Sequence, residues 1–97
     1  MDKCALITGA TRGIGKQIAI TLAKQGYNIA LNYRKENEEL ENTKKEIEEI
    51  GVQVIAVKGD VANFEDCENF VKQVIERFGQ IDVLVNNAGI TKDMLLM

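Results

Sequence analysis

Three glycines, Gly9, Gly13 and Gly15, lie close together in the segment TGATRGIG. The segment stands between an apolar run at 4–8, which predicts a buried strand, and an amphipathic pattern at 14–25, which predicts a helix. The N-terminus of a helix offers free N–H groups and a partial positive charge, and glycine lets a phosphate approach the backbone. We therefore predict a phosphate-binding turn, in which Gly9 permits the bend, Gly13 leaves room for a pyrophosphate and Gly15 lets the helix pack closely. A glycine-rich loop without a ligand is the alternative.

Charged residues follow the next predicted strand, in the run Asn32-Tyr33-Arg34-Lys35. A carboxylate at this place would select NAD by binding the ribose 2′-hydroxyl, but no acid occurs before Glu36. Arg34, helped by Arg12 in the glycine turn, could instead bind a 2′-phosphate through charge-assisted hydrogen bonds. NADP(H) is therefore favoured over NAD(H). Two exposed arginines without selectivity are the alternative.

A third polar turn, Gly59-Asp60-Val61, follows the third predicted strand. Spacing alone favours a ligand contact by Asp60 no more than a residue that only closes the turn. Thr8 and Thr11 could bond either backbone or phosphate.

These residues are positioned by an alternation of strand and helix patterns. The predicted strands are 4–8, 28–33, 52–58 and 81–86, and the predicted helices are 14–25, 36–50 and 64–78. Near-continuous apolar strands joined by helices predict an α/β fold with a parallel sheet covered on both faces. Right-handed crossovers place the first two helices on one face and the third on the other, which gives the order 3-2-1-4. This is a doubly wound sheet of the Rossmann type, with its ligand expected beside strands one and four.

The predicted helices carry apolar stripes that we expect to be buried. The stripe of the first helix consists of Ile14, Ile18 and Leu22, with Ala19 and Ala23 beside it; that of the second consists of Leu40, Thr43, Ile47 and Ile50; and that of the third consists of Cys67, Phe70, Val71, Val74, Ile75 and Phe78. Asn63 is expected to cap the third helix, with Asp66 as a weak capping-box partner, and Gly79 to end it.

The composition excludes several classes of function. The 97 residues are 45% hydrophobic and 28% charged, which indicates a folded protein, and the net charge of −3 offers no general attraction to nucleic acid or to an anionic membrane. No apolar run could span a bilayer and no signal peptide is recognisable, so a cytoplasmic location is expected. The absence of histidine excludes a Ser-His-Asp triad and His-ligated metal, and no metal site is expected. Cys4 and Cys67 are expected to be small buried hydrophobes rather than redox groups.

The glycine segment TGATRGIG resembles the first motif of the short-chain dehydrogenases/reductases, and Asn86-Asn87-Ala88-Gly89 resembles their second signature. Gly59-Asp60-Val61 is similar to the family's adenine-binding turn, and this resemblance implies that Asp60 accepts from the adenine amino group while Val61 covers the ring. The phrase LVNNAGITKDMLLM is closest to the 3-oxoacyl-[acyl-carrier-protein] reductases of fatty acid synthesis. The resemblance implies NADPH-dependent reduction of a 3-oxoacyl group on acyl carrier protein and a homo-oligomer, a tetramer in whole members. Another short-chain reductase, acting on an acyl-CoA, a sugar or a steroid, and a fragment that binds NADP(H) without catalysis are the alternatives.

The resemblance assigns cofactor contacts but no catalytic residue. The expected contacts are Gly9, Ala10, Thr11, Arg12, Gly13, Ile14, Gly15, Arg34, Asp60, Val61, Asn87, Ala88 and Gly89, whereas Asn86 is expected to tie neighbouring strands together. Family members use a serine and a Tyr-x-x-x-Lys pair beyond the second signature, and neither Tyr27 nor Tyr33 is followed four residues later by lysine. Residues 1–97 are therefore interpreted as the N-terminal, NADP(H)-binding part of one Rossmann-type domain, truncated after the fourth strand and inactive alone. Its fourth strand is expected to be an exposed apolar edge that promotes association.

Overall fold

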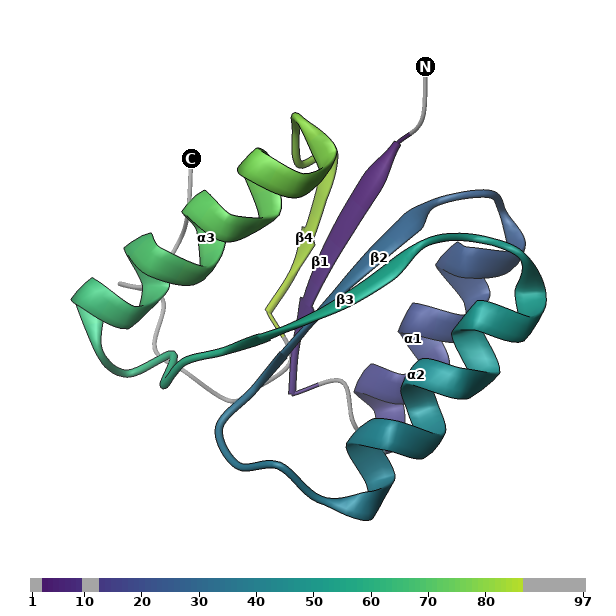
Figure 1. Ribbon diagram of the computed structural model, residues 1–97, viewed down its shortest axis with the longest axis horizontal. Coiled ribbons are helices and arrows are strands. Elements are labelled where there is room, and N and C mark those ends of the chain that lie inside the picture. Colours follow the sequence, from purple (N-terminus) through teal and green to yellow (C-terminus); the bar gives the residue numbers. More distant parts are fainter. Residues whose placement is uncertain (1–2, 10–12, 87–97) are drawn as a thin grey trace.

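The computed structural model describes residues 3–9 and 13–86. Four parallel strands form one sheet in the order β3-β2-β1-β4, and three helices pack on it (Figure 1). The strands are β1 (Cys4–Thr8), β2 (Asn28–Tyr33), β3 (Val54–Lys58) and β4 (Val83–Val85), and the helices are α1 (Gly13–Lys24), α2 (Glu38–Ile50) and α3 (Phe64–Phe78). The predicted fold class, strand order and alternation of elements are confirmed.

The register brings the carboxyl ends of all four strands to one edge of the sheet. Thr8 at the end of β1 lies opposite Asn32 on β2, and Tyr33 at the end of β2 lies opposite Lys58 at the end of β3. On the other side of β1, Ile7 pairs with Val85 of β4. The segments that leave these strand ends therefore start from neighbouring points in space.

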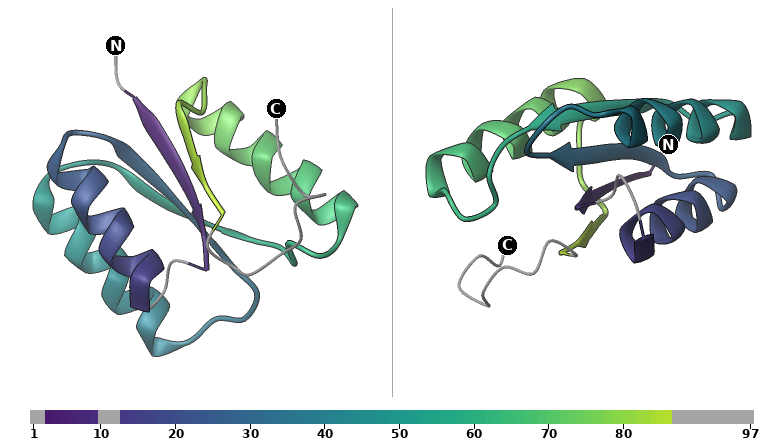
Figure 2. Two further views of the ribbon diagram at one scale, coloured as in Figure 1. Left: turned by 180° about the vertical axis from the view of Figure 1, so that it is seen from behind. Right: turned by 90° about the horizontal axis from the view of Figure 1, so that it is seen from below.

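Two layers of helix enclose the sheet, as expected. Helices α1 and α2 lie on one face and α3 lies on the other, an arrangement that is clear from the front and from behind (Figures 1 and 2). Alternate residues of the strands supply the two cores. Ile7 and Leu31 pack beneath α1 and α2, whereas Leu6 and Ala30 pack beneath α3.

The face that α1 turns to the sheet differs from the predicted one. Its buried residues are Gly15, Ala19 and Ala23, while Ile18 is only half-buried and Ile14 is 72% exposed. The small side chains allow the helix to approach the sheet, and Ile14 lies well round the helix from them at about 100° per residue. The prediction that Ile14 is buried is therefore wrong.

The third helix shows one smaller difference. Cys67, Phe70 and Val74 form its buried face, but Ile75 is 46% exposed because it lies at the edge of that stripe. Its predicted ends are confirmed. The side chain of Asn63 caps the first turn and Gly79 ends the helix with φ 85°.

Several predicted elements are shorter than expected. Helix α2 begins at Glu38 rather than at residue 36, because Asn37 is its N-cap and accepts a hydrogen bond from the Leu40 N–H at 2.8 Å. Strand β3 begins at Val54 rather than at residue 52, and β4 covers three residues instead of 81–86.

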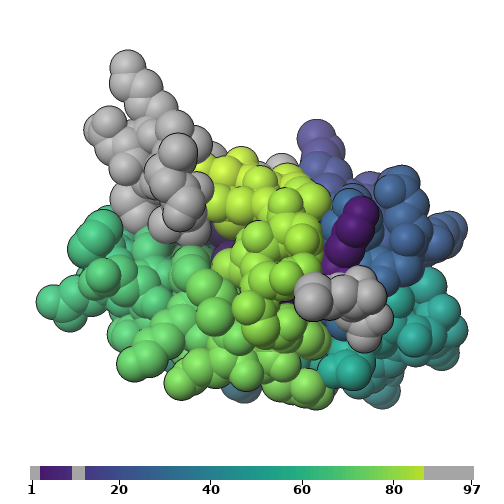
Figure 3. Space-filling model, turned by 90° about the horizontal axis from the view of Figure 1, so that it is seen from above, coloured from purple at the N-terminus to yellow at the C-terminus, as the bar shows by residue number. Residues whose placement is uncertain are grey.

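Two hydrogen bonds between Cys4 and Asp82 secure β4 at the end where it begins. The Cys4 N–H donates to Asp82 Oδ2 at 2.8 Å, and the Asp82 N–H donates to the Cys4 carbonyl, also at 2.8 Å. Figure 3 looks onto this edge and shows the chain between α3 and β4, in yellow-green, beside the purple start of β1. Among the described residues, no helix is both long and apolar enough to cross a membrane.

Candidate dinucleotide-binding site

The glycine turn links β1 to α1 at the carboxyl edge of the sheet. Gly9 and Gly13 have φ values of 61° and 65°, a left-handed conformation that strongly favours glycine. A Cβ atom at Gly13 would meet nothing within 4 Å, so the space beside this backbone is open. Gly15 is buried in the first turn of α1. The turn therefore presents the start of a helix, whose first N–H groups lack intrahelical acceptors, at the edge where the strands end.

Thr8 joins the ends of β1 and β4 at the floor of this turn. Its buried hydroxyl lies 3.4 Å from the Val85 carbonyl oxygen and 3.3 Å from Asn86 Oδ1, and can donate to either. The expectation that Asn86 ties neighbouring strands together is thus confirmed. Of the two roles left open for Thr8, the structure shows hydrogen bonding within the protein.

Asn32 joins the ends of β2 and β3 in the same way. Its buried Nδ2 donates to the Val57 carbonyl at 3.3 Å and to the Gly59 carbonyl at 3.2 Å. Sequence reasoning overlooked this residue as an organiser of the site. The available signal was a polar amide near the end of an otherwise apolar strand, because a buried amide must find hydrogen-bond partners.

A hollow of about 400 Å³ lies beside these strand ends. Its lining residues are Arg34, Lys35, Lys58, Gly59, Asp60 and Asp66. Two residues predicted as cofactor contacts, Arg34 and Asp60, are therefore brought together, and Lys58 joins them although sequence reasoning did not select it. Arg34 and Lys58 are exposed. The wall formed by β2 and β3 is thus rich in positive charge.

The two carboxylates of this hollow also organise its backbone. Asp60 Oδ1 accepts from the Ala62 N–H and Asp66 Oδ2 accepts from the Asp60 N–H, each at 2.9 Å. Asp60 therefore does close the turn. Its other carboxylate oxygen could accept from an adenine amino group, and that contact stays a prediction. The expected capping-box role of Asp66 is wrong, because its carboxylate bonds Asp60 while the Asn63 N–H donates to the Asp60 carbonyl.

Val61 is buried below this turn rather than displayed on it. Only 6% of the residue is exposed, and it packs in the core cluster that contains Phe70. Cys67 donates its thiol to the Val61 carbonyl at 3.3 Å, so both side chain and backbone are engaged. A contact between Val61 and an adenine ring would use the small remaining surface.

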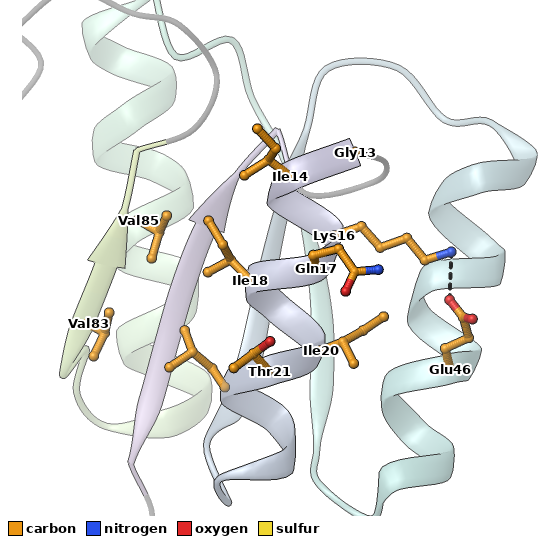
Figure 4. A pocket seen from close by; sticks show the side chains of 11 residues that line it. Gly13, Ile14, Lys16, Gln17, Ile18, Ile20, Thr21, Glu46, Val83 and Val85 are labelled. Atoms are coloured by element: carbon orange, nitrogen blue, oxygen red, sulfur yellow. Dashed lines mark ion pairs between the residues drawn. The ribbon is translucent and has the colours of Figure 1, made fainter.

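A second hollow, of about 790 Å³, runs along α1 on the side that faces β4 (Figure 4). Ile18, Val83 and Val85 form its apolar wall, and the predicted contacts Gly13 and Ile14 lie at one end. At its far rim the Lys16 ammonium pairs with a Glu46 carboxylate oxygen at 2.7 Å. Because the wall of this hollow is mainly apolar, its chemistry suits a phosphate group less well than the charged residues at the strand ends do.

The raised pKa values of two side chains near the site favour their neutral forms. The pKa of Tyr33 is raised above 10.0, first by partial burial and then by the carboxylates of Glu36 and Glu41. Burial and the neighbouring Asp66 also raise the pKa of the Cys67 thiol above 9.0. In residues 3–9 and 13–86, no group of three His, Cys, Asp or Glu side chains could hold a metal ion.

Six predicted contacts lie outside the described residues: Ala10, Thr11, Arg12, Asn87, Ala88 and Gly89. Nothing in the structure tests them. Gly9, Gly13, Gly15, Arg34 and Asp60 all occur at the carboxyl edge or in the turn that leaves it. Ile14 lies in the first turn of α1, where its backbone rather than its exposed side chain is suited to a phosphate.

The strand order, the glycine turn and the charged strand ends together define a Rossmann-type α/β protein. The chain belongs to the short chain dehydrogenase family, whose model matches residues 3–96.

Known members of the family confirm this assignment. The chain is 50% identical over all 97 residues to the 3-oxoacyl-[acyl-carrier-protein] reductase FabG of Staphylococcus epidermidis, and covers 40% of that protein. It resembles the crystal structure of acetoin dehydrogenase from Enterobacter cloacae with a TM-score of 0.84 and 33% identity, over 95% of this chain and 36% of that one. A short-chain dehydrogenase/reductase from Burkholderia xenovorans gives a TM-score of 0.88 at 28% identity, over 93% and 37% of the two chains. The chain thus spans about two fifths of the length of these oxidoreductases.

Proposed function

We propose that this chain is the NADP(H)-binding part of a reductase that acts on a 3-oxoacyl group carried on acyl carrier protein. The 50% identity to the FabG protein over the full 97 residues supports the substrate class. The observation that carries the cofactor proposal is the hollow at the ends of β2 and β3, where Arg34 stands among cationic neighbours and no carboxylate ends β2. The family resemblance supports a cytoplasmic homo-oligomer.

In this proposal each part of the carboxyl edge has one task. The N-terminus of α1 and the turn from Gly9 to Gly15 hold the pyrophosphate through backbone N–H groups. Arg34 binds the 2′-phosphate with paired, charge-assisted hydrogen bonds. Asp60 accepts from the adenine amino group, and the NNAG segment approaches the ribose. The bound cofactor supplies the hydride for reduction of the carbonyl.

Reversal of charge at Arg34 tests the cofactor proposal. Arg34→Asp should weaken NADPH binding at least about tenfold and strengthen NADH binding, because a carboxylate repels the 2′-phosphate and accepts from a free 2′-hydroxyl. Titration of this chain with each dinucleotide, followed by calorimetry or nucleotide fluorescence, gives the two dissociation constants.

The matched control is Arg77→Asp, an equal change of charge in the last turn of α3, outside the hollow. This control should leave the ratio of the NADPH and NADH dissociation constants unchanged. An unchanged ratio in Arg34→Asp would defeat the assignment of Arg34.

Catalysis and binding without turnover are separated by an NADPH oxidation assay with an acetoacetyl thioester. We propose that the 97-residue chain alone binds the cofactor without oxidising it, because neither Tyr27 nor Tyr33 begins a Tyr-x-x-x-Lys pair. Oxidation by the chain alone would contradict this.

The second candidate function is that of a short-chain oxidoreductase with a different substrate. The structural similarity to acetoin dehydrogenase favours this candidate. Comparison of acyl carrier protein and coenzyme A thioesters with a full-length protein containing this sequence would decide.

A further inference from the structure

Lys58 occupies a place that the glycine motif and the residues after β2 do not identify. It is the last residue of β3 and lies in register opposite Tyr33, the last residue of β2. The chain continues from Tyr33 directly into Arg34, and Lys58 and Arg34 line the same hollow. Cations from two adjacent strands therefore border one space at the carboxyl edge of the sheet.

The hollow is lined by three cations and two carboxylates, so its lining keeps a net charge of +1. Both Asp60 and Asp66 use a carboxylate oxygen to accept a backbone N–H, as described above. Within the described part of the chain, Arg34, Lys35 and Lys58 form no ion pair with any carboxylate. A doubly charged phosphate could thus bind without first displacing a protein partner.

The backbone that carries Lys58 is fixed on both sides. Asn32 Nδ2 holds the carbonyls of Val57 and Gly59, the residues before and after Lys58. The Gly59 N–H donates to the Tyr33 carbonyl at 2.9 Å, which joins the ends of β3 and β2. A Cβ atom at Gly59 would lie 2.7 Å from Phe70 Cδ2, so this backbone also rests directly against α3. Lys58 and the residue before Arg34 therefore belong to strand ends that are joined directly by hydrogen bonds.

We propose that Lys58 is a further specificity-determining residue, which binds the 2′-phosphate of NADP(H) from β3 while Arg34 binds it from β2. The inference rests on the proposed cofactor function and adds a second strand to the phosphate subsite. Because NAD(H) lacks this phosphate, Lys58 raises affinity for the phosphorylated dinucleotide alone. The rigid β2–β3 junction favours this role, since preorganised donors bind a phosphate with little loss of backbone freedom.

Two adenosine nucleotides that differ only in the 2′-phosphate provide the test. The 97-residue chain is titrated calorimetrically with adenosine 2′,5′-bisphosphate and with adenosine 5′-monophosphate, and the ratio of the dissociation constants is recorded. Lys58→Gln should weaken binding of the bisphosphate about tenfold and change binding of the monophosphate less than about twofold. Lys58→Arg, which keeps the charge, should retain the preference. Lys24→Gln, an exposed lysine in the last turn of α1, is the matched control and should change neither constant.

The outcomes separate this inference from the function on which it rests. A wild-type chain that binds the bisphosphate no better than the monophosphate overturns both. If wild type prefers the bisphosphate and Arg34→Gln loses that preference while Lys58→Gln keeps it, the cofactor proposal stands and the role of Lys58 is wrong. Equal weakening of both nucleotides by Lys58→Gln would also overturn the specificity role. Circular dichroism of each variant verifies that the fold is retained.

Discussion

The thiol of Cys4 shows how strongly its surroundings can hold a side chain in one protonation state. Cys4 is 1% exposed in the first position of β1, and the Asp82 carboxylate bonded to its N–H lies nearby. Burial, with a smaller effect of the Asp82 charge, raises its pKa from 9.0 to about 12. A thiol needs to ionise to react, so Cys4 is a packing residue at neutral pH.

The raised pKa of Cys4 predicts a loss of stability in alkali. Up to about pH 9 the thiol is protonated in both the folded and unfolded chain. Between pH 9 and about 12 only the unfolded chain ionises, so the free energy of unfolding should fall as the pH rises, by at most about 1.4 kcal/mol per pH unit from this group.

Urea unfolding at a series of pH values from about 8 to about 10.5 measures this effect. Cys4→Ala serves as the reference, because it removes the titrating group and should give a shallower decline whatever its constant loss of packing energy. Parallel pH profiles for wild type and Cys4→Ala would show that Cys4 does not ionise differently in the two states.

Helix boundaries in this chain are encoded by a repeated pair of residues. An asparagine caps α2 and α3 at their starts, and a glycine with positive φ ends each of them, Gly51 at 110° and Gly79 at 85°. The asparagine side chain satisfies an N–H that the helix itself cannot bond, and the glycine adopts a left-handed conformation without a Cβ penalty. These ends therefore depend mainly on local sequence.

Removal of one cap should destabilise the fold by a modest amount. Asn63 Oδ1 accepts from the Asp66 N–H at 3.1 Å, so Asn63→Ala should lower the free energy of unfolding by about 1 kcal/mol. Asn69→Ala, the same substitution at an exposed position inside α3, should be neutral or slightly stabilising because alanine favours a helix interior. Equal losses in the two variants, measured by urea unfolding, would contradict the capping role.

Local signals account for what the sequence predicted at the level of elements. Apolar runs located the strands, and caps such as Asn63 and Gly79 located helix ends, because each depends on residues close in sequence. The face of α1 was mispredicted because large apolar residues outweighed the small ones. Gly15, Ala19 and Ala23 face the sheet because their small size lets α1 pack close to it. Hydrophobicity alone does not indicate this requirement.

The candidate site was predicted only where a motif marks it. Gly9, Gly13 and Arg34 follow from recognisable patterns after β1 and β2. Asn32 and Lys58 do not, since their roles arise from the pairing of β2 with β3, in which bonded partners are 25 residues apart. Contacts across a sheet depend on register, and no local pattern in this chain specifies that register.

At the scale of the whole molecule, an apolar surface lies between α1 and β4 in the described part of the chain. Ile14, Ile18, Val83 and Val85 border the hollow of about 790 Å³ there, and β4 forms an edge of the four-stranded sheet. An apolar face beside a strand edge promotes contact between molecules. The expected occupant for the 97-residue chain in dilute solution is a second copy.

Sedimentation velocity over a range of concentrations should show self-association of the chain. Ile14→Lys should weaken it, because a charge enters the apolar border at a side chain that contributes little to the core. Ile75→Lys places the same charge on α3, across the sheet, and should leave association unchanged. A monomer at every concentration would overturn the expected self-association. Equal effects of the two substitutions would show that the contact between molecules lies elsewhere.

The place of β1 in the middle of the sheet has a consequence for the order in which the chain folds. Its pairing with β2 joins neighbouring segments, whereas its hydrogen bonds to the β4 region join residues 78 apart in sequence. Closing the longer loop costs more entropy, so early refolding should assemble β1, β2 and β3 with their two crossover helices. The last strand to dock is then β4, so the hollow at the ends of β2 and β3 should form before the junction of β1 with β4, which the Thr8–Asn86 hydrogen bond completes.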